Sequence, residues 1–144
     1  MERINFMTAS PNAVKAWRAL EQYIATSRID KPLAELVRLR SSQINGCAFC
    51  VDMHATDAAK GGDTARRLHA VSVWRETPFF TARERAALAW TETMTRLAQQ
   101  PDTGESYAEL AAQFSAEEMV DLTLLISTIN GWNRLAVGFG KMPE

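Results

Sequence analysis

The stretch CAFCVDMH, residues 47–54, contains both cysteines of the 144-residue chain and one of its two histidines. If this stretch is helical, Cys47, Cys50 and His54 lie on one face, because side chains three and four positions apart are neighbours on a helix. Dithiol redox chemistry needs a nucleophilic sulfur, a second sulfur within reach and a base that accepts a proton. The stretch therefore predicts a helix that carries a thiol-dependent redox site.

The sequence on both sides of this stretch also has helical periodicity. Apolar residues recur at helical spacing in segments over about residues 11–24, 31–44, 47–60, 63–73, 81–100, 106–114 and 115–134. No segment alternates apolar and polar residues with the period of a strand. We therefore predict an all-α protein, a single-domain helical bundle of about six to seven helices over residues 1–144, with the C-x-x-C motif at a helix N-terminus.

Local signals set the expected ends of these helices. Thr81-Ala82-Arg83-Glu84 and Ser115-Ala116-Glu117-Glu118 are capping boxes, each of which begins a helix. We expect Gly61-Gly62 to end the helix of the motif and Pro101-Asp102-Thr103-Gly104 to form a turn. The proline-containing segment 74–80 is predicted to be a loop.

The composition excludes several classes of protein. A hydrophobic fraction of 47% is typical of a globular chain, and a net charge of -1 offers no basic excess for nucleic acid. No apolar run approaches the roughly 20 residues of a membrane span, and residues 1–6 lack the apolar segment of a secretory signal. We expect a cytoplasmic protein without a nucleic-acid or membrane partner, and in that compartment a C-x-x-C motif is more often catalytic or metal-binding than structural.

Helix geometry restricts where the first cysteine can lie. Cβ atoms three residues apart on a regular helix are roughly 5–6 Å apart, whereas a disulfide needs about 3.5–4.5 Å. Cys47 is therefore expected at the very start of the helix, where Gly46 lets the backbone turn. Free amides and the helix dipole stabilise a thiolate there, and such positions lower the pKa of a cysteine thiol from about 8.5.

The helical rise assigns the histidine to the second cysteine. His54 lies about 6 Å along the axis from Cys50 and about 10 Å from Cys47, so direct proton transfer is expected only from Cys50. The helix start favours Cys47 as the attacking thiol and the imidazole favours Cys50, and both assignments stay open. Asp57 shares nearly the same face and either orients the imidazole ring or is solvated.

Other interpretations of the motif are less well supported. Structural zinc needs four ligands, and beyond the cysteines only His54, His69 and carboxylates are available. A c-type haem motif needs histidine at position 51, which is Val51, and a thioredoxin fold needs strands. Two inert, buried cysteines remain an alternative. We expect no metal and no cofactor, and His69 is predicted at the surface or an interface.

The sequence ELVRLRSSQINGCAFCVDMH, residues 35–54, resembles the core of the alkylhydroperoxidase-D-like family, within the carboxymuconolactone decarboxylase superfamily. Residues 80–90, FTARERAALAW, resemble the helix that follows in this family, and residues 129–134, INGWNR, resemble its closing segment. The resemblance implies an all-helical peroxidase in which Cys47 and Cys50 are the redox pair and Glu35 and His54 relay protons. For Glu35, helix position alone would instead predict a solvated residue on an exposed face.

The resemblance also has consequences for substrate and assembly. Phe49 occupies the position of a second histidine in the well-studied branch, which removes a polar relay member and makes the pocket more apolar. The family implies a homo-oligomer, a trimer or a hexamer, and reduction by a dithiol or a dithiol protein, for example one of lipoyl type.

The function predicted from these observations is hydroperoxide reduction by a dithiol, in which a sulfenic acid forms and condenses to a disulfide. Two alternatives remain. One is the cofactor-free lactone decarboxylation of the superfamily's other branch, which depends on acid–base residues and not on a dithiol. The other is a non-catalytic helical redox sensor.

Overall fold

The computed structural model describes residues 1–100 and 102–144. Its helices are α1 (Phe6–Ala9), α2 (Pro11–Thr26), α3 (Lys31–Ile44), α4 (Ala48–Lys60), α5 (Ala65–Ala70), the 3-10 helix η1 (Val71–Glu76), α6 (Ala82–Thr95), α7 (Gly104–Ala111) and α8 (Ala116–Phe139). The described residues contain no strand, so the prediction of an all-α fold is confirmed. None of the helices in the described part of the chain combines the length and the apolar character needed to cross a membrane.

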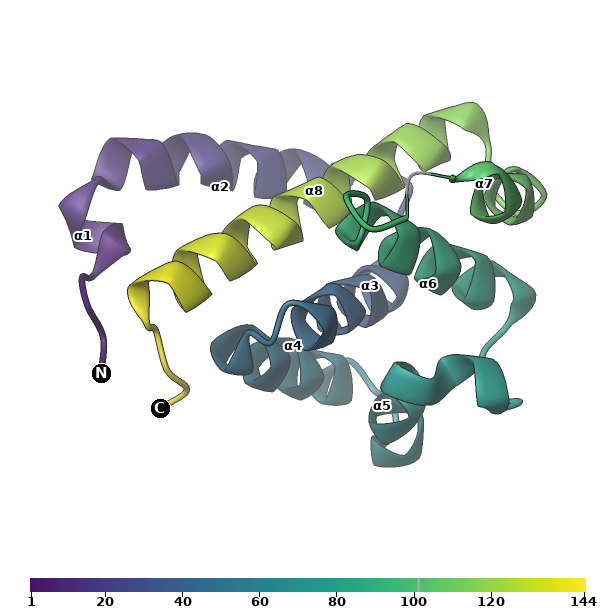
Figure 1. The fold of residues 1–144 in the computed structure, drawn as a ribbon, viewed down its shortest axis with the longest axis horizontal. Helices are drawn as coiled ribbons and strands as arrows, with labels where there is room; N and C mark the ends of the chain where they lie inside the picture. The colour runs from purple at the N-terminus through teal and green to yellow at the C-terminus, as the bar shows by residue number, and fades with distance from the viewer. Residues whose placement is uncertain (101) are drawn as a thin grey trace.

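Helix α3 is the centre of the packing. It contacts α4, α6 and α8, and Leu36 and Val37 on it are fully buried (Figure 1). One apolar cluster joins α3 to α6 and α8 and includes Trp90, and a second joins α3 to α4, α5 and η1 and includes Trp74. The helix that precedes the cysteine motif is therefore fixed on several sides.

The predicted capping boxes are present in the structure. The Thr81 hydroxyl accepts a hydrogen bond from the Glu84 backbone N–H, and the Glu84 carboxylate accepts one from the Thr81 N–H. Ser115 and Glu118 make the same pair of bonds at the start of α8. Each box satisfies two backbone amides that would otherwise lack partners, and this fixes where α6 and α8 begin.

The segment after Gly62 differs from the prediction. Helix α5 ends at Ala70, and the chain continues as η1 to Glu76, with non-helical backbone angles at Val73. The predicted loop over residues 74–80 is therefore wrong for its first three residues. The reason is tertiary: Trp74 is buried in the second cluster and its indole N–H donates to Glu92 at 3.0 Å, which holds the chain in a tight turn.

Other helix ends are also shifted. The sequence did not predict α1, which Asn5 caps by accepting bonds from two backbone amides. Helix α6 ends at Thr95 instead of near residue 100, and the predicted Pro101 turn falls partly on residue 101, outside the described residues. Helix α7 begins two residues early, and α8 continues past Arg134 to Phe139, where Gly140 adopts a φ of +73°.

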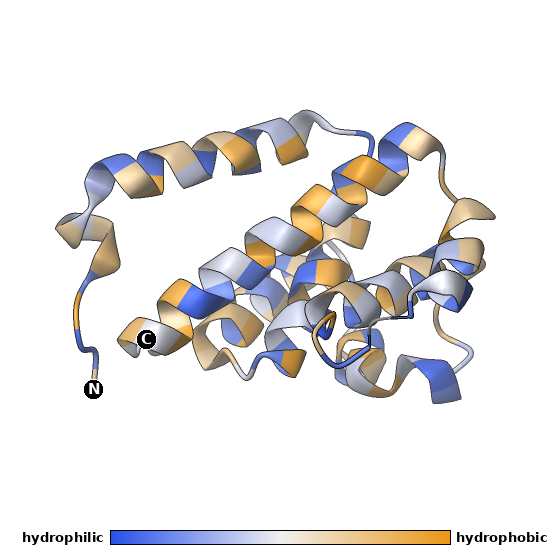
Figure 2. Cartoon of the chain, turned by 45° about the horizontal axis from the view of Figure 1, so that its top comes forward, coloured by the Kyte–Doolittle hydropathy of each residue, from blue (hydrophilic) through white to orange (hydrophobic). Residues whose placement is uncertain are grey.

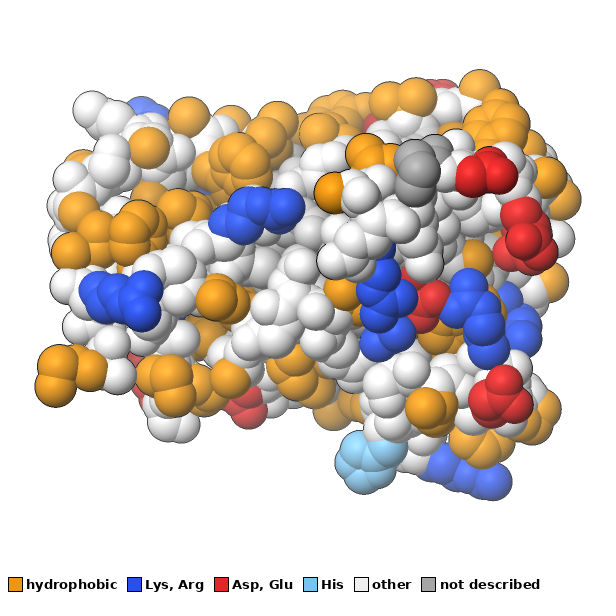
Figure 3. Space-filling view, in the orientation of Figure 1, with side chains coloured by type: hydrophobic (Ala, Val, Ile, Leu, Met, Phe, Trp, Pro, Cys, Tyr) orange, Lys and Arg blue, Asp and Glu red, His pale blue; other side chains and the backbone are white. Residues whose placement is uncertain are grey.

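Helix α2 lies along α8 at one side of the molecule (Figure 1). Orange and blue residues alternate along α2, as expected for a helix with one packed face (Figure 2). Trp17 on α2 lies over Gly131 of α8 and meets the Trp132 ring edge to face, with centroids 6.2 Å apart. The chain ends meet near α1, where the Arg3 N–H donates to the Phe139 carbonyl, and hydrophobic side chains gather at this end of the surface (Figure 3).

The contact between Trp17 and Gly131 yields a test of the packing. A Cβ added at Gly131 would lie 2.1 Å from the Trp17 ring, whereas one added at Gly138 of the same helix would have no neighbour within 4 Å. We expect Gly131→Ala to lower the free energy of unfolding by about 1–3 kcal/mol through overpacking. As the matched control, Gly138→Ala should raise it by about 0.5–1 kcal/mol, because alanine is the better helix former.

Urea unfolding followed by circular dichroism measures both changes. Equal stabilisation by the two substitutions would contradict the close packing of α2 on α8.

Candidate active site

The α3–α4 connection places the first cysteine at a helix start. Gly46 has a φ of +65°, a left-handed conformation that glycine adopts without a steric penalty. The Cys47 N–H donates to the Ser42 carbonyl at 3.0 Å, and the Cys47 Sγ accepts from the Cys50 N–H at 3.3 Å. Cys47 is thus the N-cap of α4, as the sequence predicted.

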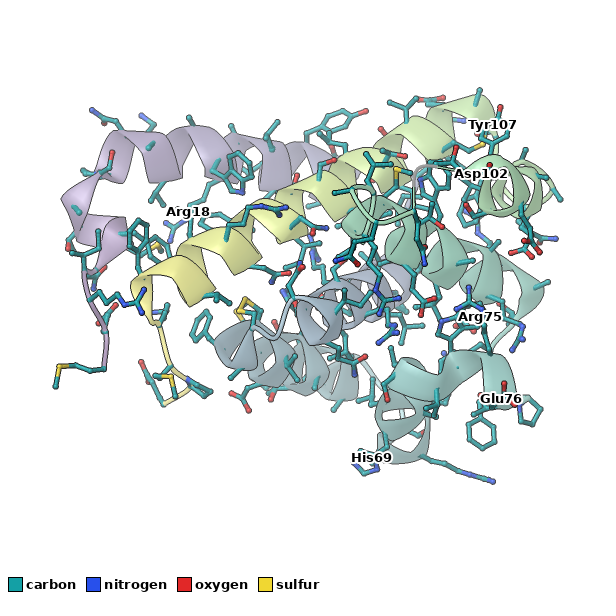
Figure 4. The ribbon with its side chains drawn as sticks, in the orientation of Figure 1. Arg18, His69, Arg75, Glu76, Asp102 and Tyr107 are labelled. Carbon is teal, nitrogen blue, oxygen red and sulfur yellow. A yellow bond between two sulfur atoms is a disulfide. The ribbon has the colours of Figure 1, made fainter. Side chains whose placement is uncertain are left out.

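Cys47 and Cys50 are joined by a disulfide, with Cα atoms 5.3 Å apart (Figure 4). Both residues are buried, at 1% and 2% exposure. The pair is nevertheless not symmetric. Cys50 lines a cavity beside α4, and Cys47 is not among the described residues lining it. Both cysteines pack in one cluster with Ala136 of α8, which also lines the cavity. The two sulfurs therefore have different access to a ligand.

A cluster of asparagines holds the α3–α4 turn against α8. The Asn45 side-chain amide donates to the side-chain oxygens of Asn130 and Asn133, both at 2.9 Å. Asn133 in turn donates to the Ser42 hydroxyl at 3.0 Å and is 1% exposed. Buried amides fix a geometry well because each unmade hydrogen bond is costly. The sequence indicated residues 129–134 only through the family resemblance and did not predict this contact.

His54 and Glu35 form a buried pair across α3 and α4. His54 Nδ1 lies 2.8 Å from Glu35 Oε2. Because an ionised carboxylate only accepts hydrogen bonds, Nδ1 carries the hydrogen in this pair. In the neutral ring, the other nitrogen, Nε2, is then the proton acceptor, and Glu35 fixes which nitrogen of His54 can act as a base.

The surroundings of Glu35 keep it ionised. Burial alone would raise its pKa, but the hydrogen bond and charge of His54 and the charge of Arg38 outweigh burial, and the pKa of Glu35 is lowered. Arg38 bonds Glu35 Oε1 at 3.0 Å and Glu21 Oε2 at 2.7 Å. The other oxygen of Glu21 accepts from the Trp132 indole N–H at 3.0 Å. The site is thereby linked through α2, α3, α4 and α8.

A cavity of about 340 Å³ lies over these groups. Cys50 and His54 line it, and apolar rings from Phe6, Phe49 and Trp132 make up much of its wall. A reactant in this cavity therefore lies beside both Cys50 and His54.

Three of the side chains could in principle hold a cation. One ligand atom from each of Glu35, His54 and Asp57 lies within 4.8 Å of the others. Both oxygens of Glu35, however, already accept from His54 and Arg38, and the Arg38 guanidinium lies where a second cation would be repelled. The donor set therefore fits an internal hydrogen-bond network better than a metal ion.

The structure brings together all four residues predicted for the site, Glu35, Cys47, Cys50 and His54. The expectation from helix position that Glu35 is solvated is wrong, since Glu35 is 5% exposed. His69 lies on α5 and points into solvent, which agrees with a surface histidine (Figure 4). The sequence analysis missed Arg38 and Glu21; the spacing of Glu35 and Arg38, three residues apart on a helix, was the one available signal.

The chain is similar to known proteins over most of its length. Residues 11–93 match the model of the carboxymuconolactone decarboxylase family. The chain is 36% identical over 140 residues to the uncharacterized protein YdfG of Bacillus subtilis (strain 168), covering 97% of this chain and 95% of YdfG.

Solved structures share the fold. A protein of unknown function from Agrobacterium tumefaciens, suggested to be the antioxidant defence protein AhpD, superposes with a TM-score of 0.97 at 43% identity, covering 100% of this chain and 99% of the other. The debrominase Bmp8 superposes with a TM-score of 0.86 at 24% identity, covering 96% of this chain and 74% of the other, and shares the fold alone.

The lowered pKa of Glu35 predicts a pH-dependent contribution to stability. Glu35→Gln should lower the free energy of unfolding near neutral pH by about 1–3 kcal/mol, because it removes a charged partner from His54 and Arg38. A carboxyl with a lowered folded pKa contributes its stability above its unfolded pKa and loses it as pH falls through the folded value. The difference between variant and wild type should therefore shrink in acid.

Urea titrations from neutral to acid pH measure this difference. Glu109→Gln, which removes the same charge from an exposed position on α7, is the control and should change little at any pH. A pH-independent difference for Glu35→Gln would contradict the ionised, buried state of Glu35.

Proposed function

This chain belongs to the carboxymuconolactone decarboxylase family, in its alkylhydroperoxidase-D-like branch, and from that premise we propose that it is a thiol-dependent peroxidase acting through Cys47 and Cys50. The observation that carries the proposal is that Cys50 and His54 line one cavity while Glu35 orients the imidazole. Residues 1–144 are taken as one domain of this kind.

The first step uses Cys50, because this residue lines the cavity and lies one helical turn from His54. His54 Nε2 takes the proton of the Cys50 thiol, and the thiolate attacks an oxygen of the hydroperoxide. A sulfur–oxygen bond forms as the O–O bond breaks, and the leaving alkoxide takes the proton from the imidazolium. The products are a Cys50 sulfenic acid and an alcohol.

The second step uses Cys47. The Cys47 thiol releases its proton, and the thiolate, stabilised at the start of α4, attacks the Cys50 sulfur. The sulfur–sulfur bond forms as the sulfur–oxygen bond breaks, and the departing hydroxide takes up the released proton and leaves as water. The absence of Cys47 from the described lining of the cavity suits this role, since a resolving cysteine needs access to its partner and not to the substrate. The bridged pair is the state that the structure contains.

An external dithiol then restores the thiols. One of its thiolates attacks the Cys50 sulfur from the cavity, and its second thiol breaks the mixed disulfide, so two electrons pass to the pair. A lipoyl-type dithiol has this chemistry. The proposal includes a cytoplasmic location, where thiols are kept reduced, and assembly as a homo-oligomer.

Variants of the redox pair test the proposal. With a hydroperoxide and dihydrolipoamide, we expect Cys47→Ser and Cys50→Ser each to lose at least about a hundredfold in turnover, because the disulfide cannot form. A single equivalent of peroxide should still give a trappable sulfenic acid in Cys47→Ser and none in Cys50→Ser. Mass spectrometry after trapping measures this difference.

The two histidines provide a matched comparison. His54→Gln should lower kcat/KM by about 10²–10⁴-fold, the usual contribution of a general base, and His69→Gln, on the exposed face of α5, should have no effect. Undiminished turnover in both cysteine variants would overturn the proposal. Turnover of a carboxylated lactone without thiol dependence would indicate decarboxylation, and stoichiometric oxidation without recycling would indicate a redox sensor.

A further inference from the structure

We propose that the cavity beside Cys50 selects hydroperoxides with an apolar body and one anionic end, in the simplest case a carboxylate. The inference rests on the proposed function for the peroxide chemistry and adds the substrate class. It follows from how the charges and the apolar side chains of the cavity are distributed.

The walls of the cavity fit an apolar body. Phe6, Phe49 and Trp132 contribute rings, and Met53 and Ile129 contribute aliphatic surface. Phe6 and Trp132 also pack together, with ring centroids 6.5 Å apart, so this part of the wall is continuous. Burial of apolar surface here contributes most of the affinity but does not distinguish one hydrocarbon from another.

The lining also includes three cations, of which only one is neutralised. Arg38 is paired with both Glu21 and Glu35. Among the described residues, no carboxylate lies within 4.0 Å of the side-chain nitrogens of Arg18 or Lys141, the other two. These two positive charges are therefore available to a ligand.

The two free cations come from different segments that meet at this cavity. Arg18 is an exposed residue of α2 and is labelled in Figure 4. Lys141 follows α8, and its Nζ lies 4.7 Å from the centre of the Phe49 ring. The Phe49 ring, which replaces a histidine of the related branch, is therefore an apolar surface with the Lys141 cation over it.

The negatively charged side chains of the cavity lie beside His54. Glu35 and Asp57 lie with His54, their ligand atoms within 4.8 Å of one another. A carboxylate on the substrate is repelled from that group and attracted to Arg18 and Lys141. This polarity directs the anionic end away from His54 and leaves the peroxide end to approach Cys50.

The experiment uses a pair of substrates that differ only in charge: cumene hydroperoxide and its para-carboxylate, both small enough for a cavity of about 340 Å³. The reductant is dihydrolipoamide, which is neutral. We expect the ratio of kcat/KM for the acid over the neutral compound to fall about fivefold in Arg18→Gln and in Lys141→Gln, and the ratio in wild type to fall with added salt.

The ratio is the readout because a change in the cavity wall that affects both substrates equally cancels in it. Lys15→Gln is the matched control: it removes a charge from an exposed position on the same helix as Arg18, does not line this cavity and should leave the ratio unchanged. Unchanged ratios in both variants, with turnover intact, would overturn the inference and leave the proposed function standing.

Calorimetry with the unreactive alcohols that correspond to the two hydroperoxides separates binding from chemistry. Tighter binding of the carboxylated alcohol, lost in the Arg18 and Lys141 variants, supports the anionic subsite. If this binding is found but no peroxide is turned over, the proposed function fails and the anionic subsite stands. If the charge effects appear only when dihydrolipoate replaces dihydrolipoamide, the cations serve the reductant, and the substrate inference is overturned.

Discussion

The ionised carboxylate of Glu35, buried in a helical bundle, is the constraint that organises this molecule. A buried charge is costly unless it is paired and hydrogen-bonded. Here His54 and Arg38 occupy one oxygen each. Arg38 is itself half-buried and needs a second carboxylate, which Glu21 supplies from α2, and Glu21 bonds Trp132 of α8. The bonds that compensate the Glu35 charge thereby connect four helices around the cavity. They also set the tautomer of the His54 imidazole.

A second, uncharged constraint acts on the neighbouring turn. The amide of Asn45 bridges two asparagines of α8, and Asn133 reaches back to Ser42, whose carbonyl accepts the Cys47 N–H. The turn that begins α4 is thus tied to α8 through side chains that are not part of the Glu35 network. The turn and the Glu35 network both end on α8. This helix therefore fixes the cysteine pair and His54 relative to each other.

Local sequence signals predicted what depends on local chemistry. The capping boxes at Thr81 and Ser115 and the position of Cys47 are set by hydrogen bonds within a few residues, and these predictions are confirmed. The burial of Glu35 and the 3-10 turn at Trp74 depend on partners far along the chain, namely His54 and Glu92. Helical periodicity carries no information about such partners, and so Glu35 was expected on an exposed face and Trp74 in a loop.

The same distinction explains why spacing alone left the roles of the cysteines open. In sequence, Cys47 has the helix N-terminus and Cys50 has the imidazole, and each feature favours attack on the substrate. The tertiary structure adds a condition that neither feature contains, namely access. Cys50 lies on the cavity wall, whereas Cys47 is not among the described residues that line the cavity. In the proposed mechanism, Cys47 at the helix start therefore attacks the neighbouring sulfur, and Cys50 beside His54 is the cysteine that meets the substrate.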